Sequence, residues 1–291
     1  MAVLVAFIAI IVFWHPWSKP QVVPAPKIEN SIAVISFENQ TGDKNFEYLQ
    51  KAIPNLLITS LENTGYFYVA TWERMRDLLK QMGKDDAQFI DSDLGFSLCR
   101  REGIGAIVLG SFTKAGETFA TDVKVLDVQT KKLVRSASSR GEGVASILRI
   151  QIDELSKGIA QGMRIPQERI DAAQRNIEGI TTYSMEAYRY FLEARDAYDI
   201  DNHEEALKNL KKAIDIDPDF ALAYLKLGEV YIDLRNSTAA SDAIKKAMSY
   251  LDKVSEKERL YIEVLAAAWL GNEQDREQQI KILQMIAEKY P

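Results

Sequence analysis

The pattern of hydrophobic and polar positions divides the chain into three stretches. Residues 1–14 form an unbroken apolar run, MAVLVAFIAIIVFW. Residues 31–163 mix short apolar runs with segments whose apolar residues recur at helical spacing. From residue 183 onward, apolar residues recur at helical spacing throughout. These patterns predict an apolar N-terminal segment, an α/β domain and an all-helical region.

The middle stretch begins with strands and helices in alternation. Short apolar runs bounded by turn residues indicate buried strands, and alternation of apolar and polar residues indicates half-buried ones. We expect strands over residues 31–37, 66–70, 106–113, 119–126 and 132–139. We expect helices over residues 46–63, 71–83, 91–101 and 144–163. Pro54 would kink the first helix or mark its true start. An α/β start followed by antiparallel strands predicts a mixed sheet with helices packed on it.

The C-terminal stretch is a repeat with a period of 34 residues. Six positions recur with the same or a similar residue: Ala187 and Ala221, Tyr190 and Tyr224, Ala194 and Gly228, Ala206 and Ala240, Leu210 and Ile244, Ala213 and Ala247. A fixed period of this length is typical of stacked helix-turn-helix units. We expect paired helices over residues 187–198 and 203–214, 221–234 and 239–251, then a third, irregular pair over 258–269 and 273–290.

The N-terminal run is shorter than the roughly 20 residues that span a membrane. A membrane anchor, a signal peptide and a buried helix are therefore all open. The Pro-rich linker that follows separates the run from any core, and Trp14 and Trp17 fit an interfacial belt. A signal peptide would normally carry Lys or Arg before its apolar segment, and none is present. The expected organisation is an anchor at 1–17, a linker at 18–30, an α/β domain at 31–165, a linker helix at 166–182 and helical repeats at 183–291.

Charge is distributed unevenly along the chain. The net charge of −6 belongs entirely to the region from Tyr183 onward, which has 15 basic and 21 acidic residues. The remainder is neutral overall, so no basic domain exists and nucleic acid is not an expected partner.

The sequence contains no set of residues typical of a catalytic, metal or cofactor site. Two histidines, His15 and His203, are too few for a His-based metal site or a base–nucleophile pair. Cys99 is the single cysteine and is expected to be a buried filler rather than a reactive thiol. The acidic run Asp215–Asp219 lacks the Gly and distal Glu of a calcium loop. We therefore expect that the residues present are not those of an enzyme.

Three segments of the middle stretch resemble a known family. The segment 31–42, SIAVISFENQTG, resembles the opening of the TolB amino-terminal-like domain, in which a strand reading "IAVLPF" runs into an Asn-x-Ser/Thr-Gly turn. Residues 110–116 and 124–130, GSFTKAG and KVLDVQT, are similar to that family's later strands. The resemblance covers about residues 31–163. It implies an interaction or sensing domain of the bacterial envelope, without an active site. Such domains often precede tetratricopeptide repeats, in signalling proteins with a kinase, cyclase or DNA-binding domain.

The helical region resembles the tetratricopeptide repeat, in which inner helices line a concave groove. The second unit matches that pattern at Tyr224, Leu227, Gly228, Tyr231, Ala240, Ile244 and Ala247. Carried over by position, the groove would be lined by Tyr188, Phe191, Arg195, Tyr198, Leu225, Glu229 and Ile232. Such a groove could take a helix or an extended peptide. The alternative is that Phe191 and Tyr198 pack against the preceding linker helix.

The sequence therefore predicts a non-catalytic protein-interaction scaffold, held by residues 1–17 in a bacterial inner membrane with the bulk of the chain periplasmic. The alternative is the extracytoplasmic sensory part of a larger signalling enzyme, a kinase or cyclase, whose catalytic domain lies upstream of these residues. The apolar start and the lack of a polar cap at the end favour a fragment.

Overall fold

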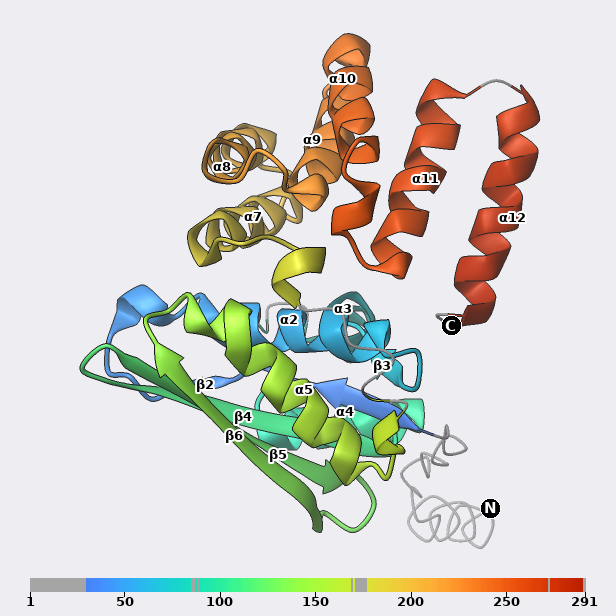
Figure 1. Cartoon of the computed structure of the whole chain (residues 1–291). Helices are drawn as coiled ribbons and strands as arrows, with labels where there is room; N and C mark the ends of the chain where they lie inside the picture. Colours follow the sequence, from blue (N-terminus) through green and yellow to red (C-terminus); the bar gives the residue numbers. More distant parts are fainter. Residues whose placement is uncertain are drawn as a thin grey trace, which may run out of the picture.

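The computed structural model describes residues 30–84, 87, 89–168, 170, 177–271 and 273–289. An α+β part with a six-stranded mixed sheet is followed by a run of paired helices, which confirms the fold class predicted from the sequence. Figure 1 shows the paired helices on one side of the α+β part, next to α2 and α3. The predicted anchor at 1–17 lies outside the described residues. Within the described part, no helix is long and apolar enough to cross a membrane.

The sheet has a parallel half and an antiparallel half that share the central strand β4. Its main path runs β3-β1-β4-β5-β6, and the short β2 pairs with β4. The strands are β1 (Ser31–Val34), β2 (Glu38–Asn39), β3 (Tyr68–Ala70), β4 (Ala106–Ala115), β5 (Thr118–Asp127) and β6 (Leu133–Glu142). In β4, Val108 pairs with Val34 in the parallel direction and with Val125 in the antiparallel direction. The predicted change from α/β alternation to antiparallel strands therefore occurs at β4.

Helices cover both faces of the sheet. On one face, α2 (Leu49–Asn63) and α5 (Ile152–Gly162) pack on the apolar side chains of β1, β4 and β5. On the other, α3 (Trp72–Gln81) and α4 (Ser92–Glu102) pack on Ala33, Ile35 and Ile107. Thr71 and Asp91 cap these two helices, and Gly103 ends α4 in the left-handed region. The short 3-10 helix η1 (Lys44–Phe46) precedes α2.

Pro54 lies inside α2 without ending it. A proline has no amide hydrogen, so the carbonyl four residues earlier loses its intrahelical partner. That carbonyl belongs to Gln50, and it accepts a hydrogen bond from the amide of Phe37 at 3.1 Å. Phe37 follows β1 and is fully buried. Pro54 therefore leaves the Gln50 carbonyl free to bond the chain after β1 to α2.

A buried polar cluster attaches α5 to β5. The helix begins with a π-helical turn, η2 (Ile147–Gln151), that brings the fully buried Gln151 side chain over the sheet. Gln151 Oε1 accepts from Thr121 Oγ1 at 2.7 Å, and its Nε2 donates to the Phe119 carbonyl at 3.2 Å and to Ser146 Oγ at 2.8 Å. Each polar atom of this amide is therefore satisfied without water.

In the described part of the repeat region, six helices form three pairs, and the first two pairs follow the predicted 34-residue period. They are α7 (Met185–Tyr198) with α8 (His203–Ile216), α9 (Ala221–Asp233) with α10 (Ser237–Met248), and α11 (Glu256–Leu270) with α12 (Glu273–Lys289). The short 3-10 helices η3 (Ile177–Ile180) and η4 (Leu251–Lys253) stand before the first pair and before α11. Repeat positions in α8 and α10 are fully buried, among them Ala206, Leu210, Ala213, Ala240, Ile244 and Ala247.

The turns inside the first two pairs also repeat, at positions that the sequence pattern did not single out. Asp201 and Arg235 both have positive φ, 58° and 57°, and they are 34 residues apart. Each is followed by an asparagine, Asn202 or Asn236, whose side chain accepts from the amide three residues on. Each asparagine is therefore an N-cap that fixes the start of the outer helix of its pair.

Candidate protein-binding groove

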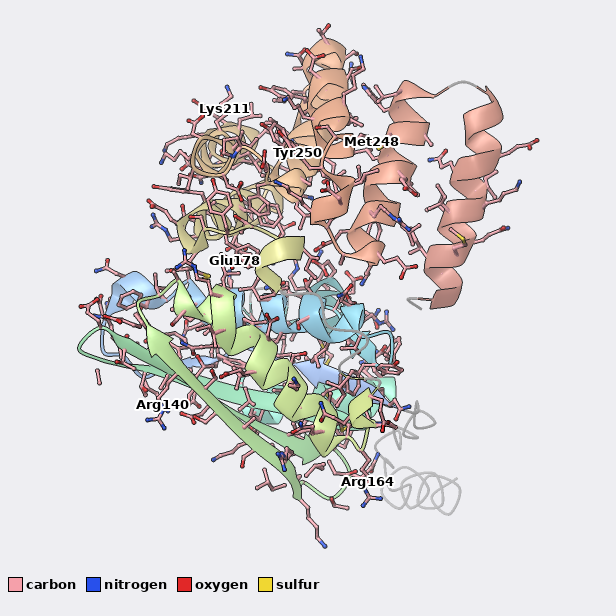
Figure 2. All side chains as sticks on the ribbon, in the orientation of Figure 1. Arg140, Arg164, Glu178, Lys211, Met248 and Tyr250 are labelled. Carbon is pink, nitrogen blue, oxygen red and sulfur yellow. The ribbon has the colours of Figure 1, made fainter. Side chains whose placement is uncertain are left out.

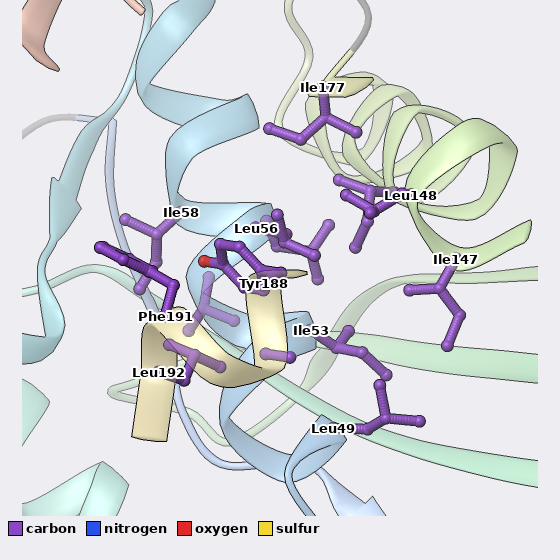
Figure 3. Packing of buried hydrophobic residues seen from close by; sticks show 14 of the residues in the cluster. Leu49, Ile53, Leu56, Ile58, Ile147, Leu148, Ile177, Tyr188, Phe191 and Leu192 are labelled. Carbon is purple, nitrogen blue, oxygen red and sulfur yellow. The ribbon is translucent and has the colours of Figure 1, made fainter. Parts of the chain in front are cut away.

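The first inner helix, α7, turns its predicted groove residues toward the α+β part. Tyr188 and Phe191 are only 4% and 7% exposed and belong to the same buried cluster as Ile58 of α2. Figure 3 shows both rings beside the side chains of α2. Phe220 closes the cluster, with its ring centroid 5.1 Å from that of Phe191 and 6.4 Å from that of Tyr188. These two side chains are therefore largely buried between the two parts of the chain.

Arg195 and Tyr198, the other predicted residues of α7, are held by neighbouring polar groups. Arg195 lies 3.6 Å from Glu73 Oε1 and donates to Asn55 Oδ1 from both terminal nitrogens, at 3.3 and 3.4 Å. Tyr198 donates its hydroxyl hydrogen to Asp233 Oδ2 at 2.7 Å, across to α9. Arg195 thus contacts α2 and α3, while Tyr198 joins one repeat unit to the next.

A set of ion pairs connects the helical repeats to α2 and α3. Besides the Arg195–Glu73 pair, Lys51 lies 2.7 Å from Asp196 and Arg76 lies 2.5 Å from Asp199. Each side carries both signs, and each charge meets its opposite, so the two surfaces match in charge. Exposed pairs of this kind contribute at most about 1 kcal/mol each, but several together specify one orientation.

The remaining pair is the most buried of the set. Lys257 of α11 lies 2.7 Å from Glu62 of α2, and the two side chains are 14% and 12% exposed. Burial raises the pKa of Glu62, while the Lys257 ammonium lowers it. The neighbouring Glu258 accepts a hydrogen bond from the Ser255 amide, and burial raises its pKa to about 7. The contact between α2 and α11 therefore contains two carboxyl groups that are both desolvated.

A cleft of about 720 Å³ lies where the two parts meet. Its walls come from α2, β3 and α3 on one side and from α7, α9 and α11 on the other. Its aromatic lining is Tyr68, Trp72, Tyr188, Phe191 and Tyr261. Its charged lining is Glu62, Glu73, Arg74, Asp77, Arg195, Lys226, Lys257 and Glu258. The four acidic and four basic groups give the cleft no preference for one sign of ligand.

The groove continues beyond this cleft into a second, more apolar hollow of about 310 Å³. Two predicted residues, Leu225 and Glu229 of α9, line it. The other lining residues are Leu222, Glu258, Tyr261, Val264, Leu265, Ala268 and Gln279. Ile232, the last predicted residue, is half-buried and lines neither hollow. The structure thus places Leu225 and Glu229 at one hollow, whose lining includes none of the predicted residues of α7.

Four lining residues of α11 were missed by the positional comparison with the tetratricopeptide pattern. Tyr261, Val264, Leu265 and Ala268 stand at spacings of 3, 4 and 7 residues, which puts them on one face of the helix. This spacing is visible in the sequence. The 34-residue period slips after Asp252, so α11 has no corresponding position in the earlier units.

Cys99, His203 and Asp217 each pack or bond within the fold. Cys99 is fully buried, and desolvation raises the pKa of its thiol to about 12. The His203 ring lies tilted against that of Tyr198, with a centroid distance of 5.7 Å. Asp217 accepts a hydrogen bond from Thr182 at 2.5 Å in the turn between repeats. Among the described residues, no group of three or more His, Cys, Asp or Glu side chains is placed to hold a metal ion.

Comparison with known proteins supports the helical assignment. The family model described as TPR repeat matches residues 196–234, from the end of α7 through α9. A relative named putative adenylate cyclase 3, from Rhizobium meliloti (strain 1021), is 24% identical over 261 residues. The alignment covers 85% of this chain and 42% of that protein, so the chain spans less than half the length of this relative.

Solved structures with similarity to the chain come from several bacteria. The LpoB C-terminal domain of Salmonella enterica is 16% identical with a TM-score of 0.33, covering 40% of this chain and 86% of that one. Lipoprotein GNA1162 of Neisseria meningitidis is 21% identical with a TM-score of 0.32, covering 38% and 80%. TolB of Acinetobacter baumannii is 16% identical with a TM-score of 0.32, covering 48% and 30%. TM-scores at this level are too low to assign a fold family.

Proposed function

We propose that this protein is a non-catalytic scaffold that binds a segment of another protein in the apolar hollow between α9, α11 and α12. The observation that carries the proposal is the lining of that hollow. Its floor is aliphatic, with Leu222, Leu225, Val264, Leu265 and Ala268, and two carboxyl groups, Glu229 and Glu258, stand at it. A partner that buries an apolar side chain and places a Lys or Arg beside it would satisfy both features.

A blocking substitution tests this site without disturbing the core. Ala268 is exposed at the hollow, so Ala268→Arg adds a long side chain there and leaves buried packing intact. Ala287→Arg, on the exposed part of α12, is the matched control because it is not among the lining residues. Peptides selected from a displayed library by the full chain should carry an apolar residue next to Lys or Arg. They should bind Ala268→Arg at least tenfold more weakly and bind Ala287→Arg normally. Equal binding to both variants would refute the assignment.

Residues 1–17 are proposed to anchor the chain in a bacterial inner membrane, with the α/β domain (31–165) and the repeats (183–291) outside the cytoplasm. This rests on the apolar run and its tryptophans, and on the resemblance of residues 31–42 to the TolB amino-terminal-like domain. Deletion of residues 1–17 should move the protein from the membrane fraction to a soluble fraction. A protease added to spheroplasts should digest the full chain if its bulk faces the periplasm.

A second candidate function is that of the sensory part of a larger signalling enzyme. The similarity to a putative adenylate cyclase, of which the chain covers 42%, favours this candidate. The genomic sequence upstream of the codon for Met1 distinguishes the two. A continuous reading frame that encodes a cyclase or kinase domain would establish the second candidate, whereas a stop codon and a ribosome-binding site would eliminate it.

A further inference from the structure

The antiparallel half of the sheet ends in a long strand with an open edge. β6 has ten residues and pairs with β5 on one side, and no described strand pairs with its other side. Unpaired amide and carbonyl groups along such an edge form a template for another strand. Figure 1 shows β6 at the border of the sheet, away from the helical repeats. This edge is therefore separate from the groove discussed above.

The hydrogen bonds at the end of the β5–β6 pair show which amides of β6 point outward. The Gly143 amide donates to the Glu117 carbonyl at 2.8 Å. Bonding alternates along an antiparallel pair, so Ala137 and Ser139 also direct their backbone groups toward β5. The amides and carbonyls of Ser136, Ser138 and Arg140 consequently face away from the sheet.

The helix α5 covers one face of β6 at close range and leaves the edge free. An added Cβ on Gly158 would lie 2.7 Å from the Ala137 Cβ, and one on Gly162 would lie 2.4 Å from the Arg135 Cβ. Only glycine allows this close approach of helix to strand. α5 thus holds β6 in place from one face of the sheet. The outer edge of β6 is therefore a rigid template for another strand.

The side chains of β6 give the edge a specific charge pattern. Its centre, residues 136–139, consists of small uncharged residues, Ser-Ala-Ser-Ser. Arg135 and Arg140 stand at either end, both exposed, and neither forms an ion pair with any described residue. Figure 2 labels Arg140 on this side of the molecule. The two guanidinium groups are five positions apart, about 17 Å along an extended strand.

The face of the sheet beside this edge is also uncovered. A shallow hollow of about 740 Å³ lies on it and is lined mainly by polar side chains. Its lining includes Glu38, Gln40, Ser111, Asp122, Lys124, Ser136 and Ser138. A strand added to β6 could therefore direct polar side chains toward this face without leaving apolar surface unburied.

We propose that β6 binds an extended acidic segment of a partner protein by strand addition. The segment would pair with the outward amides and carbonyls of Ser136, Ser138 and Arg140. Carboxylates at positions i and i+5 would lie opposite Arg135 and Arg140 and form charge-assisted hydrogen bonds with them.

A second copy of this chain fits the same edge less well. In an antiparallel pair, outward-facing residues lie opposite outward-facing residues, so pairing of two β6 strands about Ser138 would put Arg140 opposite Ser136 and Arg135 opposite Gly141 of the other copy. Neither guanidinium group would then have a carboxylate directly opposite it. The charge pattern therefore selects an acidic partner over self-association.

The proposal can be tested with a defined peptide and three variants of the full chain. The probe is a fluorescein-labelled octapeptide, Ser-Glu-Thr-Val-Thr-Thr-Asp-Ser, which carries carboxylates five positions apart. Ser138→Pro removes an outward amide that the fold does not use, so β6 stays paired with β5. Arg135→Glu/Arg140→Glu reverses the charges at the edge. Lys211→Glu/Lys245→Glu makes the same change in net charge at exposed positions of α8 and α10.

Fluorescence anisotropy should show saturable binding to the wild type and to the lysine control. Ser138→Pro and the double arginine variant should each bind at least tenfold more weakly. A probe with Lys in place of Glu and Asp should prefer the double arginine variant. Circular dichroism should show all three variants to be folded. Absence of binding to the wild type, equal binding to Ser138→Pro, or a wild-type dimer that Ser138→Pro dissociates would each overturn the proposal.

Discussion

Lys257 Nζ lies 2.7 Å from Glu62 Oε1, joining two residues that are 195 positions apart in the chain. The pair connects the third helical unit directly to the helix that packs on the sheet. We expect Lys257→Met to destabilise the fold by about 2–4 kcal/mol, because it leaves the buried Glu62 carboxylate without its ammonium partner. The double variant Lys257→Met/Glu62→Leu should lose less than the single variant does. Urea denaturation of the full chain measures these variants and Glu62→Leu alone, and a double-variant loss equal to the sum of the two single losses would show that the pair is not coupled.

Stability should fall as the pH rises through the neutral range. Burial raises the pKa of Glu258 from 4.5 to about 7, so the folded state binds a proton that the unfolded state has released between these values. Folding is then favoured at the acid end of this window, and the contribution is lost as the pH passes 7. Glu258→Gln carries no titrating carboxyl and should show a shallower decline between pH 5 and pH 8. Identical slopes for wild type and variant would contradict this assignment.

Gly228 and Ile244 should behave as a coupled pair. A Cβ on Gly228 would lie 2.9 Å from Ile244 Cγ1, so the two helices of the second unit approach at this point. Gly228→Val should cost about 1–3 kcal/mol by overpacking. Adding Ile244→Ala should recover part of that loss, although the alanine alone destabilises the protein. Thermal unfolding of the four proteins gives the coupling, and Gly179→Ala, with open space around its Cβ, is a neutral control.

Phe191→Ala should lower the free energy of unfolding. The ring is 7% exposed and packs between α2 and Phe220, so its removal should cost about 3–4 kcal/mol. Ile200→Ala, at a side chain that is 75% exposed, should change stability by less than about 0.5 kcal/mol. If Phe191→Ala kept full stability and lost only partner binding, the ring would instead belong to an open groove.

The fold was predictable because its local patterns agree with one another. The alternation in β5, the caps at Thr71 and Asp91 and the 34-residue period each specify an element without reference to distant residues. Pro54 was ambiguous for the opposite reason. The helix continues through Pro54 because the Gln50 carbonyl accepts a hydrogen bond from the Phe37 amide. Phe37 lies outside the helix, and no sequence pattern announces this bond.

The site was predicted only in part, because exposure depends on what packs against a helix. Tyr188 and Phe191 occupy positions that face a groove in a free repeat array, but here α2 covers them. Leu225 is one unit further along and stays at the rim of an unfilled hollow. Sequence periodicity identifies the inner face of each helix and gives no information on which part of that face another domain occupies.

The Lys257–Glu62 contact between α2 and α11 fixes the distance between the two proposed binding places. α2 lies on the sheet, and the sheet ends in β6, so the hollow beside α11 and the edge of β6 belong to one continuous packed body. Two partners, one bound at the hollow and one at the edge of β6, would be held at a constant distance from each other. Fluorescence energy transfer between labels at the two places should therefore report one constant distance.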